Sequence, residues 1–269
     1  MSLSVIKFGG SAITIKERPF TVRRKAIKRL CMQVLNYVNS GGKAIIVHGG
    51  GSFGHPVAIK YRLNEGLINE ESYAGVSLTR LAMRKLNERI VREYLKLGGR
   101  PFTIEPSSSF LLKDGSLKSY FLESIEVALR NGFTPILHGD VVLDESEKKI
   151  SILSGDVIAS ALALELKADK LIYVLDVNGI YTENPKENPN ARPLKVLSRD
   201  LLGEIRIRGA LDATGGLARK IREAFKAYEG GVKFVCFLGW RRNNLLRALK
   251  GLNFKGTVLG EVKDIGLCE

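Results

Sequence analysis

The sequence predicts an α/β protein, a three-layer αβα sandwich around a mainly parallel sheet. Short apolar runs typical of buried strands alternate along the chain with longer segments whose apolar residues recur at helical spacing. Glycine-rich turns follow several of these runs, at the strand ends where open α/β sheets bind ligands. The alternation favours parallel strands joined by helices that cover both sheet faces. No internal repeat or linker-like stretch interrupts the 269 residues, so we predict a single domain.

Each predicted element follows from its local pattern. Apolar runs bounded by glycine turns predict strands at 5–8, 44–47, 134–138, 170–175, 232–238 and 256–259, with a brief extended piece at 101–104. Two short runs around a charged turn predict a hairpin of 141–143 and 149–153. Helical spacing, closed in several cases by glycine, predicts helices at 21–39, 76–97, 124–131, 154–166, 215–228 and 245–249. Three prolines and two asparagines make 185–193 a loop.

Composition narrows the classes of protein. The net charge of +14 suits a nucleic acid, an anionic membrane or a phosphorylated small substrate, although a solvated basic surface explains it equally well. No apolar run is long enough to span a bilayer, and a strand begins within four residues, which leaves no room for a signal peptide. The cysteines, Cys31, Cys236 and Cys268, have no metal-site or disulfide spacing. We therefore expect a cytoplasmic protein.

The segment from Val47 to Pro56 predicts an anion-binding loop. Four glycines follow a strand, and a helix is expected to begin with Pro56 in its first turn. Glycines let backbone N–H groups approach a phosphate, a helix N-terminus adds partial positive charge, and His55 offers a donor at the rim. The pattern Gly49-x-Gly51-x-x-Gly54 matches a dinucleotide-binding fingerprint, but no strand with a terminal acid follows it. Taken by itself, this loop could also be a glycine turn that has no function, and that alternative stays open.

Five motifs occur in the order seen in the amino acid kinase superfamily, and together they cover essentially the whole chain. They are Lys7-x-Gly9-Gly10-Ser11, His48-Gly49-Gly50-Gly51, Ser154-Gly155-Asp156, Asp176-x-x-Gly179-Ile180-Tyr181-Thr182 and Thr214-Gly215-Gly216-x-x-x-Lys220. Within that superfamily the chain is most similar to the isopentenyl phosphate kinases, because Gly-Gly-Gly-Ser-Phe-Gly-His-Pro resembles the loop that binds their substrate's phosphate. Acetylglutamate and glutamate kinases lack this histidine, whereas fosfomycin kinases have a similar one.

The resemblance implies an amino acid kinase fold with two lobes, an acceptor-binding lobe over 1–166 and a nucleotide-binding lobe over 167–269. It implies in-line transfer of a phosphoryl group from ATP to isopentenyl phosphate, in an alternative mevalonate route, by a homodimer. Phosphoryl transfer is catalysed mainly by positioning and charge stabilisation, and a phosphomonoester is already mostly dianionic at neutral pH, so no general base is needed. Mg²⁺ is expected on the ATP phosphates, with no dedicated protein metal site.

The predicted site residues follow from these motifs. Lys7 leaves a strand directly before glycines, a position that needs an anion, and the resemblance implies that Asp156 orients Lys7 and Lys220. The expected catalytic residues are Lys7, Lys16, His55, Asp156 and Lys220. The expected acceptor-binding residues are Gly50, Gly51, Ser52, Gly54, His55, Met83, Gly139 and Gly155. The expected nucleotide-binding residues are Lys7, Gly9, Gly10, Ser11, Asp176, Gly179, Tyr181, Lys186, Gly215, Gly216 and Lys220.

Several alternatives stay open at this point. A lysine can be a solvated surface charge, His55 a structural histidine, Asp156 a helix-cap neighbour, and Tyr181 a core residue. The apolar stripe after residue 76 can be plain core rather than a wall for an isoprenoid tail. Other functions to weigh are a fosfomycin or phosphonate kinase, a basic nucleic-acid-binding module, and a catalytically silent nucleotide sensor.

Overall fold

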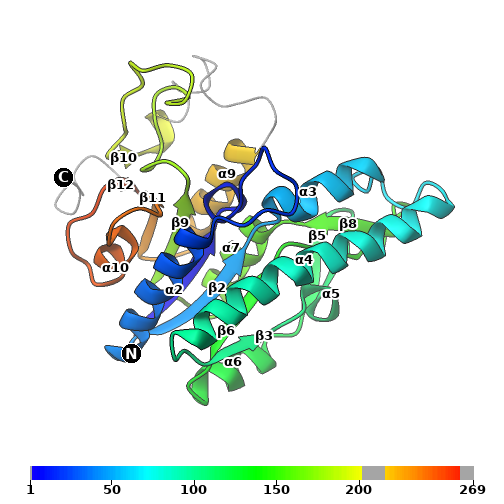
Figure 1. The fold of residues 1–269 in the computed structure, drawn as a ribbon, viewed down its shortest axis with the longest axis horizontal. Coiled ribbons are helices and arrows are strands. Elements are labelled where there is room, and N and C mark those ends of the chain that lie inside the picture. Colours follow the sequence, from blue (N-terminus) through cyan, green and yellow to red (C-terminus); the bar gives the residue numbers. More distant parts are fainter. Residues whose placement is uncertain (1, 202–215, 261–269) are drawn as a thin grey trace.

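An eight-stranded sheet forms the centre of the computed structural model, which describes residues 2–201 and 216–260 (Figure 1). The strand order is β10-β12-β11-β9-β1-β2-β6-β3. Its strands are β1 Leu3–Phe8, β2 Lys43–His48, β3 Pro101–Thr103, β6 Thr134–His138, β9 Lys170–Leu175, β10 Val196–Leu197, β11 Phe234–Gly239 and β12 Gly256–Leu259. Strands β11 and β12 pair antiparallel and the other neighbours pair parallel, which confirms the mainly parallel sheet.

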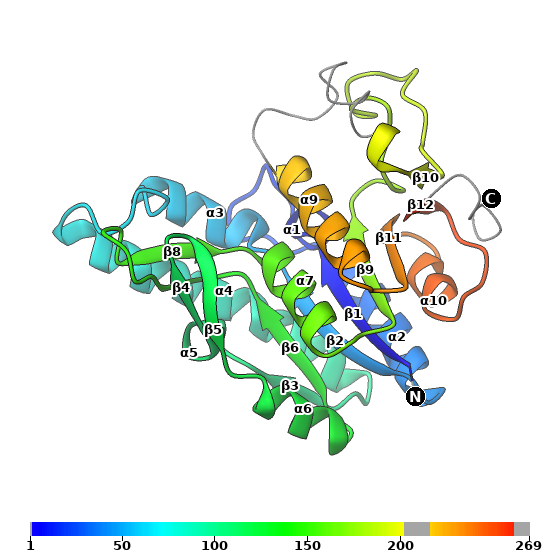
Figure 2. The same ribbon diagram turned by 180° about the vertical axis from the view of Figure 1, so that it is seen from behind.

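Helices cover both faces of this sheet. They are α1 Gly10–Ile13, α2 Arg24–Asn39, α3 Gly51–Lys60, α4 Glu70–Lys96, α5 Pro106–Ser109, α6 Glu123–Arg130, α7 Gly155–Glu165, α9 Gly216–Glu229 and α10 Asn244–Leu249. Helices α2, α4 and α10 pack on one face, and α6, α7 and α9 on the other (Figures 1 and 2). This arrangement confirms the three-layer αβα sandwich.

The side chains on the two faces of β1 pack into two separate cores, because successive strand residues point in opposite directions. Val5 lies in the core with α7 and α9, whereas Ile6 and Phe8 lie in the core with α2 and α4. Lys7 shares the face of Val5, and its strand neighbours are Val47 on β2 and Tyr173 on β9. Strand alternation therefore directs the Lys7 side chain toward α7 and α9.

Two predicted helix starts are wrong. Helix α3 begins at Gly51 rather than near Pro56, so the glycines belong to its first turn and Pro56 lies inside it. Helix α4 begins at Glu70 rather than at 76, because Asn69 and Ser72 form a reciprocal capping box that the apolar pattern did not reveal.

Segments between the predicted elements also fold. Strands β4 Phe110–Lys113 and β5 Ser116–Tyr120 form an unforeseen hairpin, while β7 Asp140–Leu143 and β8 Ile150–Leu153 form the predicted one. Short helices α1 and α5 and the two-residue strand β10 were not predicted either. Among the described helices, none combines the length and the apolar character that a membrane span requires.

Candidate active site

Asp156 joins two lysines from distant parts of the chain at the carboxyl edge of the sheet. Its carboxylate lies 2.8 Å from Nζ of Lys7, and Nζ of Lys220 donates to both of its oxygens at 2.8 and 3.0 Å. Lys7 comes from β1, Asp156 from the first turn of α7 and Lys220 from α9. The predicted cap belongs to Ser154, whose hydroxyl accepts from the Val157 amide, so the Asp156 carboxylate is left for the lysines.

Burial gives this cluster its electrostatic character. Lys7 and Asp156 are each only 4% exposed. Burial raises the pKa of Asp156, but the charges of Lys7 and Lys220 outweigh it and hold that pKa well below its ordinary range. Burial lowers the pKa of Lys7 to about 8, aided by Lys220 and opposed by Asp156. Two cations share one carboxylate, so the cluster carries surplus positive charge suited to phosphate.

His55 lies on α3, within electrostatic reach of this cluster. His55 is exposed at the surface, but desolvation by the atoms around its ring, followed by the charges of Lys7 and Arg219, lowers its pKa below its ordinary value. The ring is therefore mostly neutral in the protein alone, and the predicted rise of its pKa applies to a site that holds a phosphate dianion. Arg219, next to Lys220 on α9, is a cation that sequence reasoning missed, because it stands at an unspecified position of the motif that ends in Lys220.

Close backbone approaches explain the glycines at the start of α1 and α3. A Cβ on Gly10 would lie 2.5 Å from the Gly51 amide nitrogen, and one on Gly9 would lie 2.6 Å from the Val174 carbonyl oxygen. A Cβ on Gly49 would lie 3.3 Å from Nζ of Lys7. The N-termini of α1 and α3 thus meet beside Lys7, and helix N-termini are where anions bind.

Met83 packs against the glycine face of α3. A Cβ would lie 3.1 Å from its sulfur at Gly50 and 2.6 Å from it at Gly54, so both glycines let α3 approach α4. Met83 is only 2% exposed. The structure therefore places the predicted acceptor residues Gly50, Gly54 and Met83 together, directly beside His55.

The ends of β6 and α7 close the other side of this region. A Cβ on Gly139 would lie 3.0 Å from the Gly155 amide, and one on Gly155 would lie 2.9 Å from the His48 carbonyl. His48 and His138 are fully buried, with ring nitrogens near Asn87 and the Gly139 carbonyl respectively. These two histidines are interior residues, unlike His55.

The predicted nucleotide residues gather at the ends of β1 and β9. Asp176 accepts from the Ser11 hydroxyl at 3.1 Å and forms an ion pair with Lys186. Gly179 has a φ of +113°, and a Cβ there would lie 2.6 Å from Oγ1 of Thr257. Tyr181 is half-buried and bridges to Pro193, so it is not a core residue.

The start of α9 is only partly described. Among the residues that the structure describes, none has an atom within 4 Å of a Cβ placed on Gly216. Gly215 and its neighbour Thr214 lie outside the described residues.

Lys16 lies apart from the buried charges. It belongs to the loop after α1, and its side chain is exposed. Asp156 pairs with Lys7 and Lys220, so the structure does not bring Lys16 into the cluster that those three residues form.

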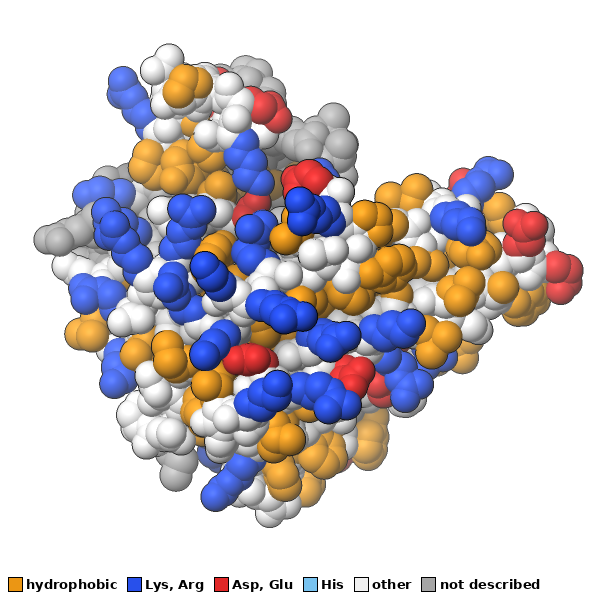
Figure 3. All heavy atoms as spheres, in the orientation of Figure 1, with side chains coloured by type: hydrophobic (Ala, Val, Ile, Leu, Met, Phe, Trp, Pro, Cys, Tyr) orange, Lys and Arg blue, Asp and Glu red, His pale blue; other side chains and the backbone are white. Residues whose placement is uncertain are grey.

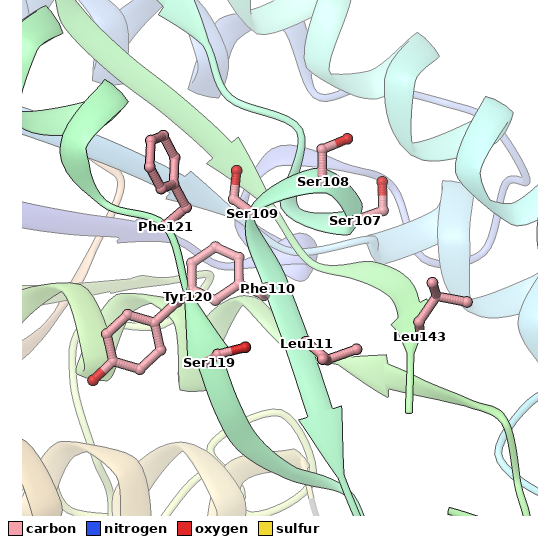
Figure 4. Close-up of a pocket in the computed structure, with 9 residues that line it drawn as sticks. All are labelled: Ser107, Ser108, Ser109, Phe110, Leu111, Ser119, Tyr120, Phe121 and Leu143. Atoms are coloured by element: carbon pink, nitrogen blue, oxygen red, sulfur yellow. The ribbon is translucent and has the colours of Figure 1, made fainter. Parts of the chain in front are cut away.

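Two surface pockets lie away from this cluster. One, of about 370 Å³, is lined by residues of α5, β4, β5 and β7, with Tyr120 and Leu143 at opposite ends of the view in Figure 4. The other, also of about 370 Å³, is lined by residues of β3 and α6 and of the segments that flank α6, and these include large apolar side chains and the polar Glu123, Ser124 and Asn131. Neither pocket contains a predicted site residue. Among the described residues, no group of three or more His, Cys, Asp or Glu is placed to hold a metal ion.

Comparison with known proteins shows which family this chain resembles. The amino acid kinase family model matches residues 2–238. The isopentenyl phosphate kinase of Methanothermobacter thermautotrophicus is 35% identical, over 94% of this chain and 97% of the relative. That of Thermoplasma acidophilum is 32% identical, over 96% of this chain and all of the relative.

The chain belongs to the isopentenyl phosphate kinases of the amino acid kinase family.

Solved structures support the same family membership. A crystal structure of an isopentenyl phosphate kinase superposes with a TM-score of 0.83 at 32% identity, covering 96% of this chain and 100% of the other. A substrate complex of an isopentenyl phosphate kinase matches with a TM-score of 0.78 at 29% identity, covering 97% of this chain and 100% of the other. The resemblance seen in the five motifs and the predicted fold are both confirmed.

Proposed function

We propose that this protein is an ATP-dependent kinase that phosphorylates isopentenyl phosphate to isopentenyl diphosphate. The observation that carries the proposal is the Lys7–Asp156–Lys220 cluster, with His55 close enough for the charges of all three to influence its pKa. Two lysines and Arg219 give a site rich in cations, and His55 adds a hydrogen-bond donor, as transfer between two anions requires. The relatives are named as kinases of isopentenyl phosphate.

The chemistry needs little from the protein beyond charge and position. A terminal phosphate oxygen of the acceptor attacks the γ-phosphorus of ATP, the bond from that phosphorus to the β–γ bridging oxygen breaks, and ADP leaves. The attacking oxygen carries no proton, because the second pKa of a phosphomonoester is about 6. Asp156 supports Lys7 and Lys220 without facing the acceptor, so the repulsion between carboxylate and phosphate stays small.

Roles for the other residues follow from their places. Lys7 and Lys220 bind the transferring phosphoryl group, and His55 and Lys16 bind the acceptor phosphate. Met83 and the glycines of α3 form the acceptor wall. Ser11, Asp176, Gly179, Tyr181 and Lys186 bind the nucleotide. Lys186 is held by Asp176 in this structure and exchanges that carboxylate for the ATP phosphates.

Mg²⁺ completes the proposal as the counter-ion of the ATP phosphates. The described residues offer no carboxylate cage, so phosphate oxygens and water supply most of its ligands. When bound, the ion compensates charge on the β- and γ-phosphates.

Assembly and location extend the same proposal. The family resemblance implies a homodimer, and exposed Phe102, Phe121, Val127 and Phe133 beside the edge strand β3 give it an apolar surface. Its cysteines, which have no disulfide spacing, fit the reducing cytoplasm, where ATP is available.

Turnover measured side by side tests the acceptor. The purified protein with Mg-ATP is given isopentenyl phosphate, fosfomycin, acetylglutamate and UMP in parallel. We expect isopentenyl phosphate to give the highest kcat/KM. Negligible turnover of isopentenyl phosphate would contradict the proposal, and preference for fosfomycin would favour a phosphonate kinase.

Binding to nucleic acid remains the alternative from another class. Exposed Arg24, Lys25, Lys28 and Arg29 lie along α2, and Figure 3 shows Lys and Arg side chains spread over this face among hydrophobic and acidic ones. A salt-dependent affinity for nucleic acid tighter than that for ATP would favour this alternative.

A further inference from the structure

A proline inside α3 leaves one helix carbonyl without its usual partner. Pro56 is the sixth residue of α3, and proline has no N–H to donate to the carbonyl four residues earlier, which belongs to Ser52. The Ser52 carbonyl instead accepts from the Phe20 amide at 3.0 Å. The chain therefore uses the acceptor that Pro56 frees to hold a different segment.

That segment is the loop between α1 and α2, which carries Lys16 (Figure 1). A bridge between Thr14 and Val22 closes its base, and the Ile15 amide donates to the Thr21 carbonyl at 3.0 Å. We call residues 15–21 the Lys16 loop.

Ser52 contacts this loop and its base at three points. Besides the bond from Phe20 to its carbonyl, its amide donates to Oγ1 of Thr14 at 3.0 Å, and its hydroxyl oxygen accepts from the Thr21 amide at 3.3 Å. One residue of α3, three positions before His55, thus fixes the Lys16 loop.

Phe20 shows that this attachment is needed. Its φ is +54°, a left-handed conformation that costs a non-glycine residue about 1–2 kcal/mol. The residue is 52% exposed, and its ring meets the ring of Phe53 edge-on, with centroids 5.6 Å apart. A strained and half-exposed residue stays in place only while the surrounding contacts hold it.

We propose that Pro56 is a positioning residue that leaves the Ser52 carbonyl open, so that the Lys16 loop is fastened to the helix that presents His55. Lys16 and His55 are then held as one unit against the acceptor phosphate. This inference rests on the proposed function, because it assigns that unit to acceptor binding.

Pro56→Ala tests it, with Pro106→Ala as the matched control. Alanine at 56 restores an N–H that pairs with Ser52, whereas Pro106 is the first residue of α5, where a new N–H has no helical acceptor. In Pro56→Ala we expect the Phe20 amide to exchange with solvent about tenfold faster or more. We expect KM for isopentenyl phosphate to rise about fivefold, with KM for ATP unchanged.

A measurement of thermal stability distinguishes a positioning role of Pro56 from a merely structural one. Alanine is the better helix former, so the melting temperature of Pro56→Ala should stay level or rise while acceptor binding weakens. In a protein that already carries Lys16→Ala, Pro56→Ala should raise KM for isopentenyl phosphate little further, because the loop no longer carries the lysine that it positions. An unchanged Phe20 exchange rate, or equal shifts of both KM values, would overturn the proposal.

The exchange measurement needs no substrate. If the wild-type protein fails to phosphorylate isopentenyl phosphate, the proposed function fails, yet Phe20 exchange still decides whether Pro56 frees the carbonyl that holds the loop.

Discussion

Asp156 holds Lys7 and Lys220 side by side while staying ionised. A buried carboxylate between two cations is favoured because each partner offsets the desolvation of the other. The site therefore presents fixed positive charge before ATP arrives, with no reorganisation required at the moment of transfer. His55 differs, because it is neutral in the protein alone and gains charge only beside a bound dianion.

Asp156→Asn removes the counter-charge and leaves two lysines in a buried place. We expect the free energy of unfolding to fall by about 3 kcal/mol, since breaking a buried ion pair typically costs about 3–5 kcal/mol. We expect kcat to fall about 100-fold or more. Denaturant unfolding and steady-state kinetics measure both. Asp114→Asn, the same change at an exposed turn, should alter neither, and a stable, active Asp156→Asn protein would contradict this role.

The lowered pKa of Lys7 predicts that activity declines at alkaline pH. Burial lowers it to about 8, so Lys7 is charged below that pH and loses its proton as the pH rises through it. The kcat/KM for ATP, which reports the free enzyme, should therefore decline above about pH 8. Bound phosphates raise the pKa of Lys7, so kcat should decline at higher pH than kcat/KM. A flat kcat/KM profile from about pH 7 to 9 would contradict this assignment.

His55→Gln should weaken binding of the acceptor and leave binding of the nucleotide unchanged. Loss of a charge-assisted hydrogen bond, worth about 1.5–3 kcal/mol, should raise KM for isopentenyl phosphate about tenfold or more with KM for ATP nearly unchanged. In the wild-type protein, binding takes up a proton, so KM for the acceptor should rise with pH above about 7, where the phosphate is already dianionic. His55→Gln should lose this pH dependence. Equal effects on both substrates would make His55 structural.

Helices α1, α3 and α7 begin at the same edge of the sheet, each with a glycine in its first turn. Helix N-termini carry partial positive charge, and glycines let them come close. Helix α3 is held from two directions, by the Met83 contact with α4 and by the Lys16 loop at Ser52. The acceptor side of the site is therefore set by helix packing as much as by single side chains.

Gly54→Ala tests the packing of α3 on α4. The new methyl would lie 2.6 Å from the buried Met83 sulfur and force the helices apart. Overpacking of this kind costs about 1–3 kcal/mol, and we expect KM for the acceptor to rise with it. Met83→Ala in the same protein should restore much of both losses. Additive effects in this double-mutant cycle would show that the two residues are not coupled.

At the scale of the molecule, one sheet carries both halves of the site. Strand β1 lies between β2, which leads to α3, and β9, which leads to Asp176. A parallel sheet places all these strand ends at one edge, so the residues proposed to bind the acceptor and those proposed to bind the nucleotide lie on either side of β1. The division into lobes at 166 and 167 stays a prediction.

The apolar surface beside β3 predicts a dimer interface. Val127→Glu places a charge among exposed aromatic side chains, which a second copy of this surface would have to desolvate. We expect analytical ultracentrifugation to show a dimer for the wild-type protein and a larger monomer fraction for the variant. Leu252→Glu, at an exposed leucine after α10, should leave the dimer intact. A monomeric wild-type protein would contradict the expectation.

Local chemistry in the sequence determined the fold class of this protein and indicated where an anion could bind, while the site residues themselves stay predictions. Alternating strand and helix patterns predicted the sandwich, and glycines after β1 and β2 predicted its phosphate edge, because strand period and glycine sterics act within a few residues. The family motifs added Asp156 and Lys220, which no local pattern connects to Lys7.

Only the tertiary structure decided which residues meet. It placed Asp156 between lysines 149 and 64 positions away, added Arg219 beside His55, and began α3 at Gly51 rather than at Pro56. The sequence could not show that α3 continues through Pro56. The proline leaves the Ser52 carbonyl without a partner in the helix, and the amide that bonds to it belongs to Phe20, which is 32 residues away in sequence. Long-range hydrogen bonds and buried charges take their partners from the whole fold, so local propensity cannot predict them.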